Sequence, residues 1–74
     1  MSSLQQKLGR AVQRLRKAAG YSQEAFADEV GVHRTYMGAV ERGEKNITLN
    51  NIERIAKTLK LKVGDLLIEA ERER

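Results

Sequence analysis

Apolar positions in this chain recur every three to four residues, the spacing of an α-helix that buries one face. In the first segment these positions are Leu4, Leu8, Val12, Leu15 and Ala19. They predict a helix over residues 4–19, which Gly20 can end from a left-handed conformation. The chain has no proline and only three aromatic residues, which argues against a β-sandwich or barrel. The pattern therefore predicts an all-α fold.

Four shorter helices are predicted after this first one, and each has residues suited to its ends. Their ranges are 23–30, 33–42, 49–59 and a segment from Val63 that dissolves into a solvated or frayed charged end at 69–74. The candidate N-caps are Ser22 and Thr48, and the candidate terminating glycines are Gly31 and Gly43. A chain of 74 residues supports a single core. We expect one compact five-helix domain over residues 1–74, with its core at about 7–68.

A tight connection, Val30-Gly31-Val32-His33, joins the second and third predicted helices. Ala27 allows the two helices to approach closely, Gly31 permits a positive φ, and Val32 can plug the space between them. This combination is typical of a helix-turn-helix, in which the second helix enters the major groove of DNA.

The chain resembles the Cro/repressor-like, or XRE, family of helix-turn-helix regulators over about residues 7–68. The resemblance rests on Arg16, Tyr21-Ser22-Gln23-Glu24, Ala27, Gly31-Val32 and Val40-Glu41-Arg42-Gly43. Within that family, the segments 33–43 and 45–48 are most similar to controller proteins of restriction–modification systems. The resemblance implies a lambda-repressor-like DNA-binding domain that activates and represses transcription, including its own.

The start of the third predicted helix is the expected base-reading region. Arg34 can donate paired hydrogen bonds to guanine, and Thr35 can meet an acceptor or a thymine methyl group. Ala39, one turn further, is small enough to contact a thymine methyl. Gly38 has no side chain to read with, and close approach of a backbone is a reason for a glycine there. The alternative for Arg34 is a solvated surface charge.

The flanks of this helix are expected to bind phosphates. Gln23 lies in the first turn of the second helix, where backbone N–H groups also point outward; the alternative is a glutamine that merely faces solvent. Tyr36 suits either the core or a phosphate, and the family resemblance favours the phosphate. The remaining expected phosphate contacts are Arg42, Lys45, Asn46 and Thr48.

Glu41 is out of place on a helix that faces DNA, because a carboxylate repels phosphates. The family resemblance implies that Arg16 pairs with it and that this partly buried ion pair orients the third helix.

The last helix carries Leu66, Leu67 and Ile68 in succession, and three adjacent residues cannot all face one core. We expect Val63, Leu67 and Ile68 to contribute to a two-fold interface; the alternative is that Ile68 is a lone exposed residue. A homodimer would place two reading helices roughly 34 Å apart on a near-palindromic operator, and two dimers can occupy adjacent sites.

The charge balance favours a polyanionic partner, here double-stranded DNA, because 14 Lys and Arg residues exceed 10 acidic ones. Residues 1–20 carry +5 and residues 21–33 carry −3, so we expect the acidic side of the second helix to point away from DNA or toward a neighbouring protein. With no cysteine and a single histidine, His33, at a helix start, no metal, cofactor, small-molecule ligand or catalytic site is expected.

No apolar run is long enough to span a membrane, and we expect a cytoplasmic protein that associates with the nucleoid when bound and contacts RNA polymerase. Two other functions fit the residues. One is a phage- or plasmid-type repressor or an antitoxin of the same fold. The other, from a different class, is a protein-interaction module that has lost DNA binding.

Overall fold

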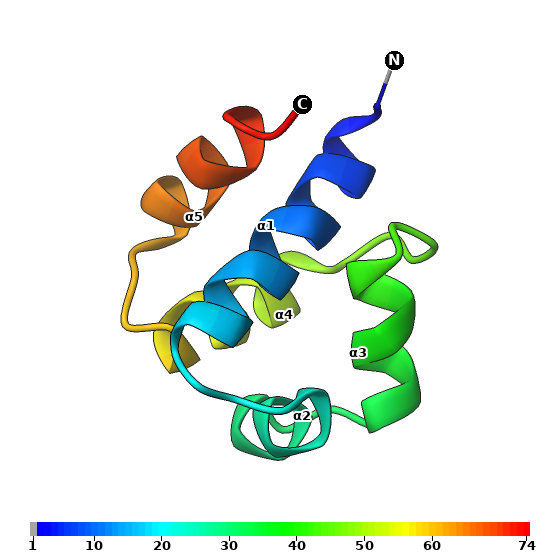
Figure 1. Ribbon diagram of the computed structural model, residues 1–74, viewed down its shortest axis with the longest axis vertical. Helices are drawn as coiled ribbons and strands as arrows, with labels where there is room; N and C mark the ends of the chain where they lie inside the picture. The colour runs from blue at the N-terminus through cyan, green and yellow to red at the C-terminus, as the bar shows by residue number, and fades with distance from the viewer. Residues whose placement is uncertain (1) are drawn as a thin grey trace.

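The computed structural model describes residues 2–74, which form five α-helices and, within that range, no β-strand (Figure 1). The helices are α1 (Leu4–Ala18), α2 (Gln23–Val30), α3 (Arg34–Glu41), α4 (Leu49–Thr58) and α5 (Val63–Glu71). The all-α prediction is confirmed, and the predicted bounds of α1 to α4 agree with the structure to within one residue. None of the described helices is both long and apolar enough to cross a membrane.

Local side-chain and backbone chemistry sets the ends of these helices. The hydroxyl of Ser22 accepts a hydrogen bond from the backbone N–H of Ala25 at 3.1 Å, and Thr48 caps α4 in the same way. Gly20 and Gly31 have φ values of 84° and 89°, in the left-handed region that glycine adopts without steric cost. Because each signal acts within a few residues, the sequence was sufficient to place these boundaries.

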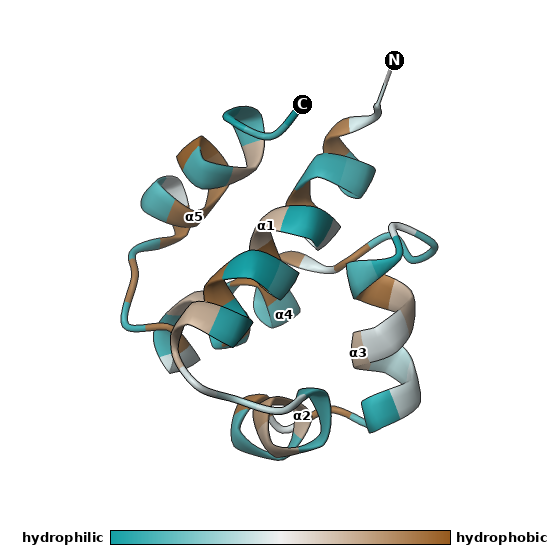
Figure 2. Cartoon of the chain, in the orientation of Figure 1, coloured by the Kyte–Doolittle hydropathy of each residue, from teal (hydrophilic) through white to brown (hydrophobic). Residues whose placement is uncertain are grey.

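Every helix contributes one large side chain to the centre of the core. Apolar and hydrophilic positions alternate along the helices, as the brown and teal segments of α1 and α5 in Figure 2 show. The largest fully buried side chains are Val12 from α1, Phe26 from α2, Met37 from α3, Ile55 from α4 and Leu66 from α5. Burying a side chain of this size stabilises the fold by about 1.5–3 kcal/mol. The core therefore depends on all five helices, and α2 and α3 are held by the other three.

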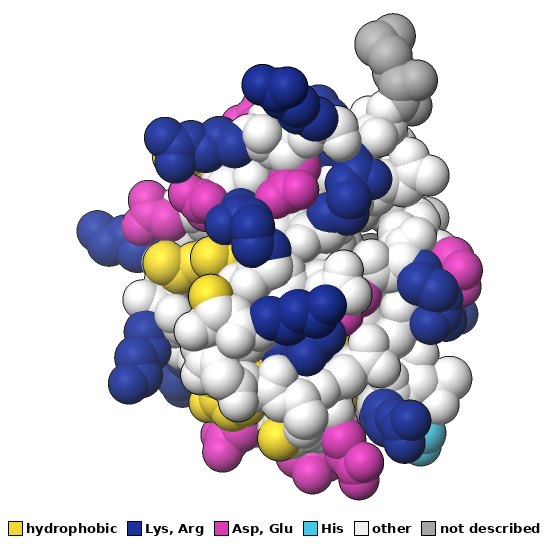
Figure 3. All heavy atoms as spheres, viewed as in Figure 1, with side chains coloured by type: hydrophobic (Ala, Val, Ile, Leu, Met, Phe, Trp, Pro, Cys, Tyr) yellow, Lys and Arg dark blue, Asp and Glu magenta, His cyan; other side chains and the backbone are white. Residues whose placement is uncertain are grey.

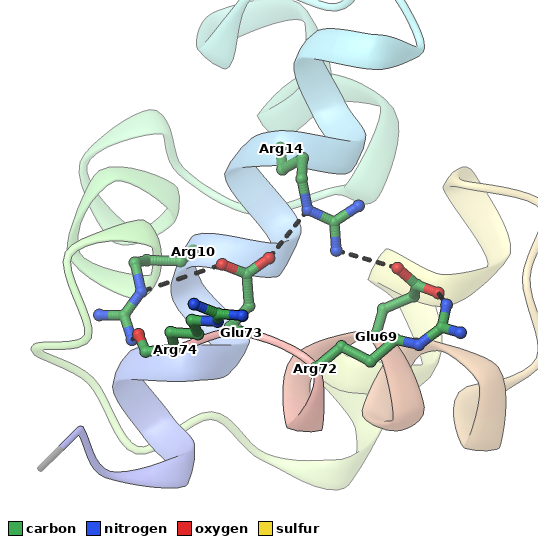
Figure 4. A network of polar contacts seen from close by, with 6 residues as sticks. All are labelled: Arg10, Arg14, Glu69, Arg72, Glu73 and Arg74. Carbon is green, nitrogen blue, oxygen red and sulfur yellow. Dashed lines mark hydrogen bonds and ion pairs between the residues drawn. The ribbon is translucent and has the colours of Figure 1, made fainter.

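The charged end of the chain is one point at which the sequence-based prediction was wrong. α5 continues to Glu71, and Arg14 of α1 lies between two carboxylates of the C-terminal end (Figure 4). Arg14 Nη2 donates to Glu69 at 2.9 Å, and Arg14 Nε donates to Glu73 at 2.8 Å. Arg10 also approaches Glu73, at 4.0 Å. These ion pairs join α1 to the end of α5, whereas the sequence predicted a solvated or frayed terminus.

The ion pairs of Arg14 with Glu69 and Glu73, here called the clamp, shift the pKa values of Arg14 and Glu69. The hydrogen bond from Arg14 lowers the pKa of the Glu69 carboxyl, partly offset by its desolvation. The carboxylates of Glu73 and Glu69 raise the pKa of Arg14. Arg10 and Arg14, two of the five basic residues within residues 1–20, are thus paired with acids of the C-terminal end.

Gly9 sets the distance between α1 and the end of α3. A Cβ atom at this position would lie 2.8 Å from the carbonyl oxygen of Glu41 and would also overlap the carbonyl of Val40. These neighbours are backbone atoms, so they cannot move aside without shifting α3. Gln5, one turn earlier on α1, donates from Nε2 to the carbonyl of Gly43 at 2.6 Å. The start of α1 therefore holds the C-terminal end of α3.

Candidate nucleic-acid interface

α2 and α3 meet at the sharp turn that the sequence predicted. The N–H groups of Gly31 and Val32 both donate to the carbonyl of Ala27, at 2.9 and 3.0 Å. Ala27 is fully buried, and Val32 is half-buried against the core. The small residue, the left-handed glycine and the plugging valine thus lie as a helix-turn-helix requires.

His33 is the N-cap of α3. Its Nδ1 accepts a hydrogen bond from the backbone N–H of Thr35 at 3.1 Å. With Nδ1 as the acceptor, the neutral ring carries its hydrogen on Nε2. The sequence placed His33 at the helix start but did not predict the cap, because histidine is not among the residues that usually fill this position.

Arg34 and Thr35, the predicted base-reading residues, are exposed at the N-terminal end of α3. Ala39 is only 7% exposed, so it offers much less surface for the thymine contact predicted for it. The guanidinium of Arg34 lies 3.8 Å from the carboxylate of Glu24 on α2. Glu24 therefore lies beside the reading end of α3, whereas the acidic side of α2 was expected to point away from DNA or toward a neighbouring protein.

Four of the predicted DNA contacts converge on one surface hollow of about 320 Å³. It is lined by Gln23, His33, Arg34, Thr35, Gly38 and Arg42. A Cβ atom at Gly38 would lie 3.1 Å from Arg42 Nη1 and 3.4 Å from Gln23 Oε1. The sequence suggested that this glycine allows close approach of a backbone. In the structure it makes room for the side chain of Arg42, the C-cap residue of α3, and for that of Gln23 on α2.

The phenol of Tyr36 is partly buried beside α4, where Asn51 Nδ2 donates to its oxygen at 3.1 Å. Because Asn51 donates to a lone pair of the phenol oxygen, the O–H group of Tyr36 can still donate to another acceptor. Arg42 pairs with Glu44 at 3.1 Å in the loop after α3. Lys45 and Asn46 in the same loop are exposed, and the exposed Thr48 uses its hydroxyl to cap α4.

The structure brings Arg16 and Glu41 together in a buried, two-pronged ion pair. Arg16 donates from Nε and Nη2 to the two carboxylate oxygens of Glu41 at 2.7 and 3.0 Å, and both residues are 6% exposed. Arg16 Nη1 also donates to the carbonyl of Tyr21 at 2.9 Å. Gln23 Nε2 donates to Glu41 at 3.1 Å, so the predicted phosphate contact also belongs to this network. The network ties α1, the start of α2 and the end of α3 into one unit.

The charges are distributed unevenly over the surface. Figure 3 shows acidic side chains over α2 at the lower edge and Lys or Arg side chains along the right edge, over α3. No group of three or more His, Cys, Asp or Glu side chains within residues 2–74 is placed to hold a metal ion. The arrangement provides hydrogen-bond donors and positive charge around an exposed helix end.

Comparison with known proteins agrees with this geometry. A family model described as helix-turn-helix matches residues 12–66. The control protein C.BamHI of Bacillus amyloliquefaciens is 43% identical over 60 residues, which are 80% of this chain and 74% of that protein. The crystal structure of the restriction–modification controller C.AhdI from Aeromonas hydrophila superimposes with a TM-score of 0.79 and is 41% identical, covering 82% of this chain and 92% of that one.

The biofilm regulator SinR, solved in complex with DNA, superimposes with a TM-score of 0.76 at 30% identity, covering 81% of this chain and 97% of that one. These similar proteins are regulators and control proteins rather than enzymes. The chain belongs to the helix-turn-helix family, as a transcriptional regulator of the XRE type.

Proposed function

We propose that this chain is a sequence-specific DNA-binding regulator that acts as a homodimer on near-palindromic operators. The observation that carries the proposal is the hollow at the start of α3, where exposed Arg34 and Thr35 stand between Gln23 and Arg42. Side chains at this end of a recognition helix reach base edges, while donors on the flanks bind phosphates.

Arg34 and Thr35 are the proposed base-reading residues, with Ala39 at most a minor apolar contact because so little of it is exposed. The proposed phosphate contacts surround the hollow and the loop after α3: Gln23, Tyr36, Arg42, Lys45, Asn46 and Thr48. The buried pair of Arg16 and Glu41 fixes the end of α3, so that its exposed start is presented at a defined angle.

A homodimer follows from the amount of sequence that one helix can read. A genome offers about a million or more competing sites, too many for one recognition helix to discriminate. Two-fold pairing doubles the recognised sequence, and the exposed Ile68 on α5, with Val63 and Leu67 nearby, supplies apolar surface for it. Two such dimers on adjacent operators, one of them in contact with RNA polymerase, would allow activation at low occupancy and repression at high occupancy.

The proposed role is control of restriction–modification gene expression, with the chain activating its own promoter and later repressing it. The support is similarity to proteins named as control or controller proteins of such systems. In this role the regulator delays the endonuclease until methylation protects the host DNA.

The direct test of base reading is Arg34→Ala. Operator DNA is first obtained by selecting bound sites from random duplexes. We expect the substitution to weaken operator binding by about 1–3 kcal/mol and binding to random DNA very little. Lys57→Ala removes one positive charge from an exposed position on α4 outside the hollow and serves as the matched control. Equal losses on operator and random DNA would contradict base reading.

A further inference from the structure

An exposed ion pair joins the two helices of the helix-turn-helix at the end that is proposed to read DNA. Arg34 is the first residue of α3, and Glu24 lies in the first turn of α2. Arg34 Nη1 lies 3.8 Å from Glu24 Oε2, and the two side chains are 67% and 70% exposed. A pair this open to solvent contributes little to the stability of the fold. Stability thus does not account for a carboxylate at this place.

The carboxylate of Glu24 also weakens the attraction of this surface to DNA. Glu41, the acid on α3 itself, is 6% exposed and is bonded by Arg16 and Gln23, so its charge is matched inside the protein. Glu24 is exposed beside Arg34, which lines the hollow proposed to meet the duplex, and there it repels phosphates. Because this repulsion acts on every duplex alike, it does not by itself change which sequence is preferred.

The geometry of the pair leaves Arg34 able to read a base. At 3.8 Å the two atoms are farther apart than in a hydrogen bond, so the carboxylate attracts the guanidinium without occupying one of its donors. The nearest nitrogen is Nη1, which leaves the edge formed by Nε and Nη2 for another acceptor. Arg16 uses the same edge to bond both carboxylate oxygens of Glu41. Two parallel donors of this kind also match O6 and N7 of guanine.

We propose that Glu24 is a positioning residue that orients the guanidinium of Arg34 toward guanine. This inference rests on the proposed function, because it assigns a part of base reading to α2. An arginine side chain loses rotamer entropy when it is fixed against a base, and a side chain that is already oriented loses less. The carboxylate also draws Arg34 away from phosphates, which a freely moving guanidinium would bind at any sequence. Glu24 thus raises the preference for the operator while it lowers the affinity for DNA in general.

The test is Glu24→Gln, which removes the charge and keeps the size of the side chain. Operator DNA comes from selection among random duplexes, and titration gives the affinities for operator and for random DNA. Loss of the oriented pair should weaken operator binding about three- to fivefold. Loss of the repulsion should strengthen binding to random DNA about twofold. A ratio of the two affinities that does not fall would overturn the proposal, because the carboxylate would then only repel DNA.

The matched control is Glu29→Gln, the same change at an exposed position of α2 that lines a different hollow, with Tyr21, Ala25 and Asp28. It should shift both affinities in the same direction by less than about twofold, because the charge is screened at a greater distance from the reading end. Circular dichroism checks that both variants remain helical. A ratio that falls equally in both variants would assign the effect to the charge of α2 as a whole and contradict the proposal.

A double-mutant cycle shows whether Glu24 acts through Arg34. In the Arg34→Ala background no guanidinium remains to be oriented, so Glu24→Gln should change the operator and random affinities by the same factor. The base preference of selected sites gives a second readout. Where Arg34→Ala loses the preference for guanine, Glu24→Gln should lose part of it, and the other positions of the site should keep theirs. A fall in the affinity ratio that persists undiminished in Arg34→Ala, or a site that relaxes at every position, would contradict the inference.

The failure of this inference is distinguishable from the failure of the proposed function, because the natural chain behaves differently in the two cases. If the natural chain prefers a selected operator and Glu24→Gln keeps that preference unchanged, the regulator stands and Glu24 does not position Arg34. If the natural chain prefers no duplex over any other, the proposed function fails, and a role for Glu24 in base reading fails with it.

Discussion

Gly38, which has no side chain, shapes the hollow at the start of α3 as much as the side chains around it do. Gly38 sits in the middle of α3 and leaves space for the ends of Gln23 and Arg42. In a helix interior glycine costs roughly 1 kcal/mol relative to alanine, so this position trades stability for the hollow.

We expect Gly38→Ala to raise the free energy of unfolding by up to about 1 kcal/mol. The new methyl group would lie 3.1 Å from the guanidinium of Arg42, the flexible and exposed end of a side chain that can move aside. Operator binding should weaken, because the methyl group fills the hollow and displaces Arg42. Denaturant unfolding and DNA titration measure the two effects. A variant that is less stable than the natural chain would contradict this account.

At the scale of elements, α5 is joined to α1 by charge as well as by apolar packing. Arg14 bonds both Glu69 and Glu73, which lie more than fifty positions away along the chain. This clamp holds the helix that carries Leu67 and Ile68, two residues of the proposed homodimer contact.

The clamp should make the free energy of unfolding depend on pH in the acid range. The pKa of the Glu69 carboxyl is lowered in the folded chain from its ordinary value of 4.5, chiefly by the hydrogen bond from Arg14. The folded state then binds fewer protons than the unfolded state, so this stabilisation is complete above the ordinary pKa and is lost as the pH falls through the lowered one. We expect Glu69→Gln to be less stable than the natural chain near neutral pH and to approach it in acid. Thermal unfolding across this range measures the difference.

The matched control for that experiment is Glu71→Gln, which removes the same charge from an exposed position on α5. Its effect on the melting temperature should be small at both ends of the pH range. A Glu71→Gln curve that coincides with the Glu69→Gln curve would assign the acid dependence to overall charge instead of the clamp.

The sequence predicted those features of the elements that depend on neighbours in the chain. Ser22, Thr48 and the positive-φ glycines act within one helical turn, so their roles could be predicted from the sequence alone. The pairing of Arg14 with the C-terminal acids was not, because it depends on where α5 packs. The closeness of Glu24 to Arg34 was missed for the same reason, since it depends on the angle between α2 and α3.

The pairing of Arg16 with Glu41 was predicted from a different kind of signal. A carboxylate on a helix expected to face DNA is out of place, and the family resemblance supplied its partner. The structure shows the bonds between them. The open apolar groove lined by Leu4, Ile52 and Leu67 gave no such signal, because its walls come from α1, α4, α5 and the loop after α3.

In the molecule as a whole, the positive charge extends beyond the residues proposed to bind DNA. Residues 54–62 contain Arg54, Lys57, Lys60 and Lys62 and no acid, so they form a second basic segment besides residues 1–20, which carry +5. The end of α4 and the turn to α5, which carry Lys57, Lys60 and Lys62, lie across the fold from α3 (Figure 1), whereas the guanidinium of Arg54 lies near Gly31 in the turn before α3. The three lysines are thus on a different side from the residues proposed to bind phosphates.

This separation predicts how operator binding responds to salt. Replacing Arg42 and Lys45 by glutamine should reduce the slope of log affinity against log salt by up to about 0.9 for each phosphate that the variant no longer neutralises. Replacing Lys57, Lys60 and Lys62 removes more charge but should leave the slope nearly unchanged, because those side chains lie away from the proposed DNA interface. Binding measured from about 50 to 200 mM salt checks both. A larger change in slope for the triple lysine variant would contradict the proposed interface, because it would place the duplex against the end of α4 and the turn to α5.

Gly9 lies on α1, which carries none of the proposed base-reading residues, yet any side chain there would press on the backbone at the end of α3. The angle at which this protein meets a promoter is therefore encoded partly at a position that never touches one. Efforts to retarget it to new operators by randomising only the residues of the reading face would leave that angle fixed. A library that also varies positions of α1 packed against α3, such as Gly9, would sample docking angles that substitutions on the reading face alone cannot reach.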